Sequence, residues 1–132
     1  MLLSVCLPAY KEDENLLNII PAIHKSLAYY DHEIVVISEQ QKSDVTFNIC
    51  NELNAEYVNR EGGNDYGDAI RTAFDVAKGK YLVIMDADGS HDPKSILDMI
   101  SKMESSNCDL VIGSRYCKGG FTDNNFILRF MS

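Results

Sequence analysis

Basic residues are scarce in this chain of 132 residues. Twelve Lys and Arg residues stand against twenty Asp and Glu residues, which gives a formal net charge of −8. Binding to the backbone of a nucleic acid depends on a basic surface. We therefore expect no nucleic-acid partner. A phosphorylated ligand would be bound more readily through a bridging cation, because the cation offsets the repulsion between the two negative charges.

Paired cysteines are lacking as well. The four cysteines, Cys6, Cys50, Cys108 and Cys117, form no CxxC motif and have no regular spacing. The first three lie in or beside apolar segments, where a free cysteine behaves as a small hydrophobic residue. This pattern is typical of a reduced, cytoplasmic protein without a zinc site.

Long apolar runs are also absent. No run of about 18 apolar residues occurs, so the sequence predicts no transmembrane helix. Residues 1–7 lack the basic and apolar regions of a signal peptide. We expect a cytoplasmic protein whose contact with a membrane, where it makes one, is peripheral and at the cytoplasmic face.

Short apolar runs and amphipathic segments alternate along the chain. This alternation predicts an α/β fold with a Rossmann-like, mostly parallel sheet and helices on both faces. The expected strands are residues 2–7, 33–37, 56–59, 80–85 and 109–113. The expected helices are residues 13–29 with a kink at Pro21, residues 44–53, residues 68–78 with Gly79 as the C-terminal cap, and a segment after Asp92 and Pro93.

The positions that follow the strands are rich in polar side chains. Ligands of open parallel sheets bind beyond the carboxyl ends of the strands, so functional residues should lie there. In this chain the strand ends lead into residues 8–12, 38–39, 60–67, 86–88 and 114–116.

Two aspartates, Asp86 and Asp88, follow the most apolar of the predicted strands. An extended backbone directs side chains two residues apart to the same side. Two like charges so close together need a cation or a proton between them. Oxygen ligands favour Mg²⁺ or Mn²⁺, usually shared with substrate phosphates. The alternative is that Asp-Ala-Asp-Gly forms a turn and binds nothing, since Asp and Gly are common turn residues.

Three segments of the chain match one family in combination. Residues 8–15 read Pro-Ala-Tyr-Lys-Glu-Asp-Glu-Asn, residues 85–93 read Met-Asp-Ala-Asp-Gly-Ser-His-Asp-Pro, and residues 112–116 read Ile-Gly-Ser-Arg-Tyr, followed by Gly119 and Gly120. The first segment resembles the opening motif of family 2 glycosyltransferases with the GT-A fold. The other two are similar to the branch of that family that glycosylates dolichol phosphate and other polyprenyl phosphates. The resemblance covers about residues 3–132.

The resemblance implies a hexosyltransferase that uses a GDP- or UDP-hexose and a lipid phosphate acceptor. It implies that Asp86, Asp88 and Arg115 are catalytic, and that Asp86 and Asp88 bind Mg²⁺ or Mn²⁺ together with Ser90. The residues expected to bind the nucleotide sugar are Pro8, Ala9, Tyr10, Glu12, Ile37, Glu39, Gly67, Asp86, Ala87, Asp88 and Arg115. The reaction would be an inverting displacement in which an anionic acceptor needs no general base.

Several of these residues also have a structural interpretation. Glu12 and Glu14 are acids in the first turn of a predicted helix, where the helix dipole favours them. Arg115 can form a surface ion pair that contributes little energy. The glycines Gly62, Gly63 and Gly67 can simply shape a loop.

Two segments depart from the family pattern. After the second strand the family carries D-D-G-S-T-D-G-T, whose acids bind the nucleotide, whereas residues 38–46 read Ser-Glu-Gln-Gln-Lys-Ser-Asp-Val-Thr. Glu39 can replace the second acid, but Ser38 has no carboxylate. In the glycine loop R-x-x-N-x-G-Y-G, Asp65 replaces a glycine. These departures leave open a degenerate, non-catalytic domain that binds a sugar nucleotide or a protein partner.

A phosphatase is the third alternative. Residues 86–90 also resemble the D-x-D-G-T signature of haloacid-dehalogenase-like phosphatases, in which Asp86 would be the nucleophile and Asp88 the acid/base. That family carries its signature near the start of the domain and an acidic pair well downstream, and no adjacent acidic pair follows Asp88.

The length of the chain bears on its domain organisation. Family 2 enzymes of this type continue into acceptor-binding elements, so we expect residues 1–132 to be a single nucleotide-sugar-binding domain that lacks most of the acceptor-binding part. The apolar residues between 126 and 131 are expected to pack on the domain, on a second copy or partner chain, or against a membrane surface.

Overall fold

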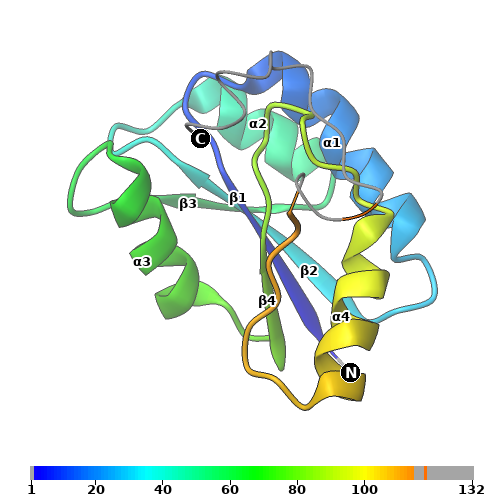
Figure 1. Ribbon diagram of the computed structural model, residues 1–132. Helices are drawn as coiled ribbons and strands as arrows, with labels where there is room; N and C mark the ends of the chain where they lie inside the picture. The colour runs from blue at the N-terminus through cyan, green and yellow to red at the C-terminus, as the bar shows by residue number, and fades with distance from the viewer. Residues whose placement is uncertain (1, 115–117, 119–132) are drawn as a thin grey trace. The chain divides into compact units, whose positions relative to one another are not determined.

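The computed structural model describes residues 2–114 and residue 118, and its centre is a parallel sheet (Figure 1). The strands are β1 (Leu3–Pro8), β2 (His32–Ser38), β3 (Glu56–Asn59) and β4 (Tyr81–Ile84). The helices are α1 (Asp13–Ser26), α2 (Asp44–Glu52), α3 (Tyr66–Val76) and α4 (Ser95–Ser106). The chain divides into two compact units, Met1–Leu97 and Asp98–Ser132, and the whole sheet belongs to the first.

The strand order is β3-β2-β1-β4, with every pairing parallel. On β1, Val5 is in register with Ile34 of β2 and with Val83 of β4. The chain moves outward from β1 to β3 and then returns to the other side of β1. Right-handed crossovers therefore place α1 and α2 on one face of the sheet and α3 on the other. The predicted fold class is confirmed, and the reversal between β1 and β4 creates a switch point of the kind where such sheets bind ligands.

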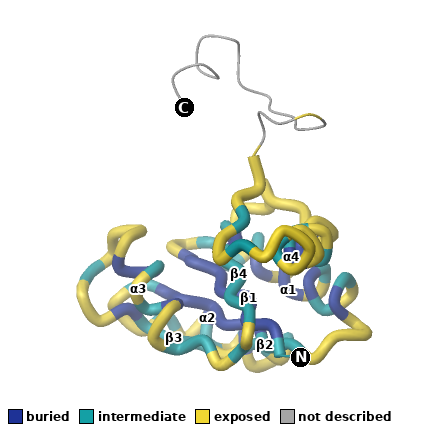
Figure 2. The backbone as a smooth tube through the Cα atoms, turned by 60° about the horizontal axis from the view of Figure 1, so that its bottom comes forward, coloured by how far each residue is buried: buried dark blue, intermediate teal, exposed yellow. Residues whose placement is uncertain are grey.

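The core follows the alternation of side chains along the strands. Cys6 of β1 and Val35 and Ile37 of β2 share a buried cluster with Ala69 and Ala73 of α3. Helix α1 buries its apolar side chains at helical spacing. These are Leu16, Ile19, Ile20 and Ile23. Figure 2 shows the two central strands, β1 and β2, as the most buried part of the sheet, and β3 and β4 are mostly intermediate.

Two of the cysteines are part of this core. Cys6 and Cys50 are fully buried and free. Burial, assisted by the charges of Glu33 and Glu56, raises the pKa of the Cys6 thiol to about 12. Burial also raises the pKa of the Cys50 thiol to about 11. Both therefore remain protonated near neutral pH and act as small apolar side chains.

The predicted fifth strand is wrong. Residues 109–113 form no strand, and Leu110 and Ile112 are 72% and 76% exposed. An apolar segment becomes a strand only where a neighbouring backbone offers hydrogen bonds, and no described segment pairs with this one.

The predicted boundaries of α3 are wrong too. The helix begins at Tyr66 because the Asp65 side chain caps it, accepting a hydrogen bond from the Asp68 N–H at 2.8 Å. It ends at Val76, so Gly79 is not its cap. Gly79 instead meets β1 closely: a Cβ at this position would lie 2.6 Å from the backbone nitrogen of Ser4.

Helix α1 also differs from its predicted extent. It ends at Ser26 rather than at residue 29, and it remains a single helix with Pro21 inside it.

Among the helices of residues 2–114, none combines the length and apolar character that crossing a bilayer requires.

Candidate functional site

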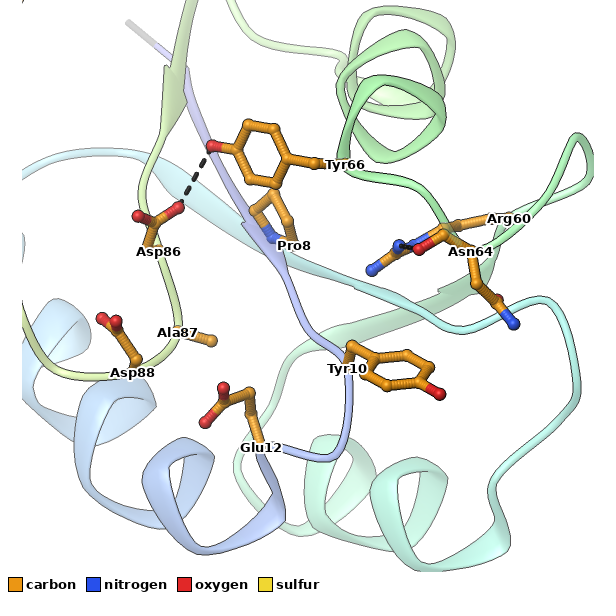
Figure 3. Close-up of a pocket in the computed structure, with 9 residues that line it drawn as sticks. All are labelled: Pro8, Tyr10, Glu12, Arg60, Asn64, Tyr66, Asp86, Ala87 and Asp88. Carbon is orange, nitrogen blue, oxygen red and sulfur yellow. Dashed lines mark hydrogen bonds between the residues drawn. The ribbon is translucent and has the colours of Figure 1, made fainter. Parts of the chain in front are cut away.

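A pocket of about 310 Å³ lies at the carboxyl ends of β1 and β4 (Figure 3). This is the switch point of the sheet. Its walls come from the turn after β1, the loop between β3 and α3, and the turn after β4. The lining residues are Pro8, Tyr10, Glu12, Arg60, Asn64, Tyr66, Asp86, Ala87 and Asp88.

The turn after β1 brings an aromatic ring and a carboxylate to the pocket. Lys11 has a φ of 57°, which turns the chain between Tyr10 and α1. Tyr10 is 48% exposed. Glu12 stands at the N-cap position of α1, yet its side chain caps no backbone N–H. Its Oε2 instead accepts a hydrogen bond from Nδ2 of Asn15 at 2.6 Å. The Glu12 carboxylate is therefore held at the pocket rather than used to start the helix.

A buried arginine, Arg60, connects two walls of the pocket through hydrogen bonds to backbone carbonyls. Arg60 is only 4% exposed. Its Nη2 donates to the carbonyl of Ala9 at 3.0 Å, and its Nη1 donates to the carbonyls of Asn64 at 2.9 Å and Asp65 at 3.2 Å. Within the described residues its Nε has no hydrogen-bond partner and no carboxylate forms an ion pair with it. A buried guanidinium without a negative partner is costly, so this end of the pocket favours an anionic ligand.

Donors surround the carboxylate of Asp86. The Tyr66 hydroxyl donates to its Oδ1 at 3.1 Å. The backbone N–H of Asp86 donates to Nδ1 of His91 at 3.2 Å, and Nε2 of His91 lies 3.8 Å from Oδ2. Because Nδ1 accepts a hydrogen bond, the ring proton of a neutral His91 is on Nε2, facing the carboxylate. The pKa of Tyr66 is raised above its usual value by burial, then by the charge of Asp86 and by the hydrogen bond from Tyr66 to Asp86. Its hydroxyl therefore remains a donor.

Asp88 is held as a carboxylate. Hydrogen bonds from the Ser90 hydroxyl and the Ser90 N–H, the latter at 2.9 Å, keep the pKa of Asp88 below its ordinary value of 3.8. Gly89 has a φ of 82°, which makes the turn that this contact needs. The segment is therefore both a turn, as the alternative interpretation holds, and a source of ionised oxygen ligands.

The carboxylate pair fits a hard divalent cation. Asp86 and Asp88 line the same pocket. In the described part of the chain, no group of three or more His, Cys, Asp or Glu side chains is arranged to hold a metal. The pair would therefore need further oxygen ligands from a bound phosphate or from water. That is how Mg²⁺ and Mn²⁺ are usually bound, and it differs from a closed zinc site.

The sequence-predicted residues fall into three groups. Pro8, Tyr10, Glu12, Asp86, Ala87 and Asp88 line the pocket. Ala9, Ile37, Glu39, Gly67 and Ser90 do not. Among these, Ala9 and Ile37 contribute carbonyl oxygens that accept hydrogen bonds from Nη2 of Arg60, and the Ile37 carbonyl also accepts one from the Ala9 N–H. The Ser90 N–H donates a hydrogen bond to Oδ1 of Asp88. Arg115 lies outside the described residues.

Three further residues of the pocket lie in the segment 60–67, which was expected to be functional, but none of the three was singled out from the sequence. Arg60 and Asn64 come from the loop between β3 and α3, and Tyr66 is the first residue of α3. Their place in the segment that follows β3 was the available signal, but nothing in the sequence shows that this segment folds back toward β1.

The fold is first that of an α/β protein of the GT-A class. Glucosyl-3-phosphoglycerate synthase from Mycobacterium tuberculosis is similar with a TM-score of 0.64 and 21% identity, over 76% of this chain and 39% of that one. Mannosyl-3-phosphoglycerate synthase from Rubrobacter xylanophilus is similar with a TM-score of 0.58 and 24% identity, over 67% and 31%. One structure of the M. tuberculosis enzyme contains Mn²⁺ and uridine diphosphate.

More specifically, the chain belongs to glycosyl transferase family 2, whose model matches residues 4–131. The dolichol-phosphate mannosyltransferase of Pyrococcus furiosus is 34% identical over 128 residues, which are 94% of this chain and 36% of the relative. The dodecaprenyl-phosphate galacturonate synthase of Rhizobium johnstonii is 28% identical over 126 residues, which are 86% and 36%. The chain thus spans 36% of the length of these two relatives. The predicted family is confirmed and replaces the phosphatase alternative.

Proposed function

We propose that this chain is the donor-binding part of a hexosyltransferase that moves a hexose from GDP- or UDP-hexose to a polyprenyl phosphate. One observation carries the proposal. An aromatic ring (Tyr10), a buried guanidinium without a carboxylate partner (Arg60) and two carboxylates (Asp86 and Asp88) line the same pocket. A nucleoside diphosphate has the matching parts, namely a flat base and a charged diphosphate. A volume of about 310 Å³ is at the small end of known ligand pockets.

The parts of the donor are assigned by chemistry. Tyr10 offers a ring face for the base, and Glu12 offers carboxylate oxygens to hydroxyls of the ribose. The diphosphate would lie beside Asp86 and Asp88. Without a cation, its charge and theirs would repel each other. The pair is therefore proposed to hold Mg²⁺ or Mn²⁺ together with the diphosphate, with Ser90 keeping Asp88 in place.

The proposed reaction is a single displacement with inversion. An oxygen of the acceptor phosphate attacks the anomeric carbon while the bond from that carbon to the nucleoside diphosphate breaks, and its electron pair leaves with the diphosphate. The acceptor oxygen is already anionic near neutral pH, so no side chain has to remove a proton. Bound Mg²⁺ or Mn²⁺ would supply Lewis-acid stabilisation of the leaving diphosphate. Arg115 is proposed to contact phosphate oxygens through its forked donors.

The acceptor class is supported by the names of the two curated relatives, which refer to dolichol phosphate and dodecaprenyl phosphate. Such an acceptor would be met at a membrane surface. We propose that residues 1–132 contribute the donor side of the enzyme, and we assign acceptor binding to none of the described residues.

A non-catalytic sugar-nucleotide-binding domain is the second candidate, and the end of β2 favours it. Ser38 is only 2% exposed, and Glu39 does not line the pocket. The acids that the family resemblance places after this strand are therefore missing from the pocket wall. Such a domain would bind the donor and transfer nothing.

Calorimetric titration tests the proposal. The chain is titrated with GDP, UDP, GDP-mannose and UDP-glucose, each with and without Mn²⁺. We expect saturable binding of one base that depends on Mn²⁺. Failure of all four to bind would overturn the donor site. The full-length protein is then supplied with the bound donor and a polyprenyl phosphate. Transfer of the hexose supports the enzyme, and donor binding without transfer supports the non-catalytic domain.

A further inference from the structure

Asp86 and Asp88 are supported in different ways. Asp88 is held by its near neighbour Ser90. Asp86 is held by Tyr66, twenty residues earlier in the chain. Figure 3 shows the Tyr66 ring reaching from the start of α3 to the carboxylate, and the two side chains come from different walls of the pocket. The hydrogen bond between them therefore joins the start of α3 to the turn after β4.

Burial alone does not fix the position of Tyr66. The residue is 56% exposed, so packing holds only part of its ring. Its backbone, by contrast, is fixed, because it is the first residue of α3 and follows the capping residue Asp65. A rigid backbone and a single hydroxyl contact make the residue suited to orient the group that it touches.

The carboxylate of Asp86 needs such an orienting group. Its side chain is 39% exposed, and Nε2 of His91 lies 3.8 Å from Oδ2, which is beyond hydrogen-bond distance. The Tyr66 hydroxyl is therefore the donor that limits rotation of the carboxylate. The Tyr66 hydroxyl occupies one lone pair of Oδ1, and each carboxylate oxygen has two. The remaining lone pairs are left for a cation. Partners that donate to metal-binding side chains typically raise metal affinity about 10–100-fold.

We propose that Tyr66 is a positioning residue that orients Asp86 for binding of the divalent cation and the donor diphosphate. It acts through Asp86 and does not itself contact the reacting atoms. This role rests on the proposed function of the pocket, because it presupposes that Asp86 meets a cation there.

The test replaces Tyr66 by Phe, which keeps the ring and removes only the hydroxyl. Binding of Mn²⁺ alone is followed by the electron paramagnetic resonance of the free ion. Binding of the nucleoside and of its diphosphate is followed by calorimetry in the presence of Mn²⁺. We expect Tyr66→Phe to weaken Mn²⁺ binding about 10-fold and to weaken the diphosphate by a similar factor. The nucleoside, which has no phosphate, should bind as before.

The matched control is Tyr29→Phe, since Tyr29 is 99% exposed and loses the same hydroxyl. It should leave all three affinities unchanged. Equal losses for nucleoside and diphosphate in Tyr66→Phe, or a lowered unfolding temperature, would mean that Tyr66 is merely structural and would overturn the inference. Unchanged Mn²⁺ and diphosphate binding would overturn it as well. If the parent chain binds neither Mn²⁺ nor any diphosphate, the proposed function itself fails.

Discussion

The two ends of the parallel sheet carry polar side chains in opposite arrangements. At the amino ends of the strands, the polar groups are paired with one another. At the carboxyl ends, they face a pocket, and part of their bonding capacity is unused. Both ends are built by the same strands, so the difference separates groups that stabilise the fold from groups that await a ligand.

The amino end is a closed network. The Ser4 hydroxyl donates to Oε1 of Glu33 and accepts from the Gly79 N–H at 2.7 Å. The Lys78 N–H donates to the same Oε1 at 2.8 Å, and its Nζ lies 2.7 Å from Oε2 of Glu56. Each of these donors has an acceptor within the network. Such groups are satisfied without any ligand.

The carboxyl end is open. Arg60 keeps a buried Nε without a hydrogen-bond partner among the described residues. Asp86 and Asp88 are both carboxylates at one pocket, with donors from Tyr66 and Ser90 and the ring of His91 beside them, and with no Lys or Arg paired to either within the described part of the chain. Carboxylates that a fold retains at a strand end without a Lys or Arg partner are typical of a binding site. Changes at the two ends should therefore have separable effects on binding and on stability.

The largest effect is expected for Asp88→Asn at the open end. The amide keeps the shape of the side chain and removes its charge. We expect Mn²⁺-dependent binding of the nucleoside diphosphate to fall by more than about 100-fold, which exceeds the usual loss from removing a supporting partner. The unfolding temperature should stay near that of the parent, because relief of the like charge of Asp86 offsets the lost contact. Calorimetry and thermal unfolding measure the two quantities.

The control is Asp75→Asn, which removes an exposed carboxylate from α3. It should leave the affinity as it is. An unchanged affinity in Asp88→Asn itself would refute the assignment of the cation to this pair.

A smaller effect, on stability alone, is expected for Gly79→Ala at the closed end. The new Cβ would lie 2.6 Å from the Ser4 nitrogen and 2.9 Å from the Leu2 carbonyl oxygen, and both are backbone atoms that cannot move aside cheaply. We expect a loss of about 1–3 kcal/mol in the free energy of unfolding, the usual cost of overpacking. Denaturant unfolding measures it.

Gly113→Ala is the comparison for that measurement, because a Cβ there meets only Met99 at ordinary contact distance, 3.6 Å. It should change the stability by much less. Nucleotide binding should be unaffected in both variants. If the two variants unfold alike, the close approach of Gly79 to β1 is not what limits the packing.

The fold could be predicted from the sequence because its signals are local. The apolar runs of β1 and β2 and the helical spacing of Leu16, Ile20 and Ile23 report burial directly. The role of Gly79 could not be predicted in this way. A glycine after a helix is commonly a cap, and only its contact with Ser4, 75 residues away, shows that it serves a close approach.

The candidate site was predicted where a motif and a strand end coincide, as at Tyr10, Asp86 and Asp88. Arg60 and Tyr66 lie in the segment 60–67, which was expected to be functional, but neither was singled out because their contributions depend on the path of the chain between β3 and α3. Only the hydrogen bond from Arg60 to the Ala9 carbonyl shows that this side chain lies beside the turn after β1. Tertiary contacts of this kind have no counterpart in local spacing.

The smallest effect is a change in pH dependence at the closed end. Burial raises the pKa of Glu33, but hydrogen bonds from Ser4 and Lys78 and the charge of Lys78 lower it more, so the pKa lies below its ordinary value of 4.5. A lowered folded pKa means that the unfolded chain binds the proton more readily. The stabilisation by Glu33 is therefore complete above that ordinary value and is lost as the pH falls through the folded pKa.

We expect Glu33→Gln to make the free energy of unfolding fall less steeply as the pH is lowered from about 6 to about 3, because the variant lacks the carboxylate that takes up the proton on unfolding. Glu52→Gln, an exposed change on α2, should follow the parent curve. Parallel curves for the parent and Glu33→Gln would mean that the carboxylate is no better stabilised in the folded protein than in the unfolded chain. The polar groups at the amino end would then have hydrogen-bond partners without a net stabilisation of the folded protein. The contrast with the pocket would rest on those partners alone.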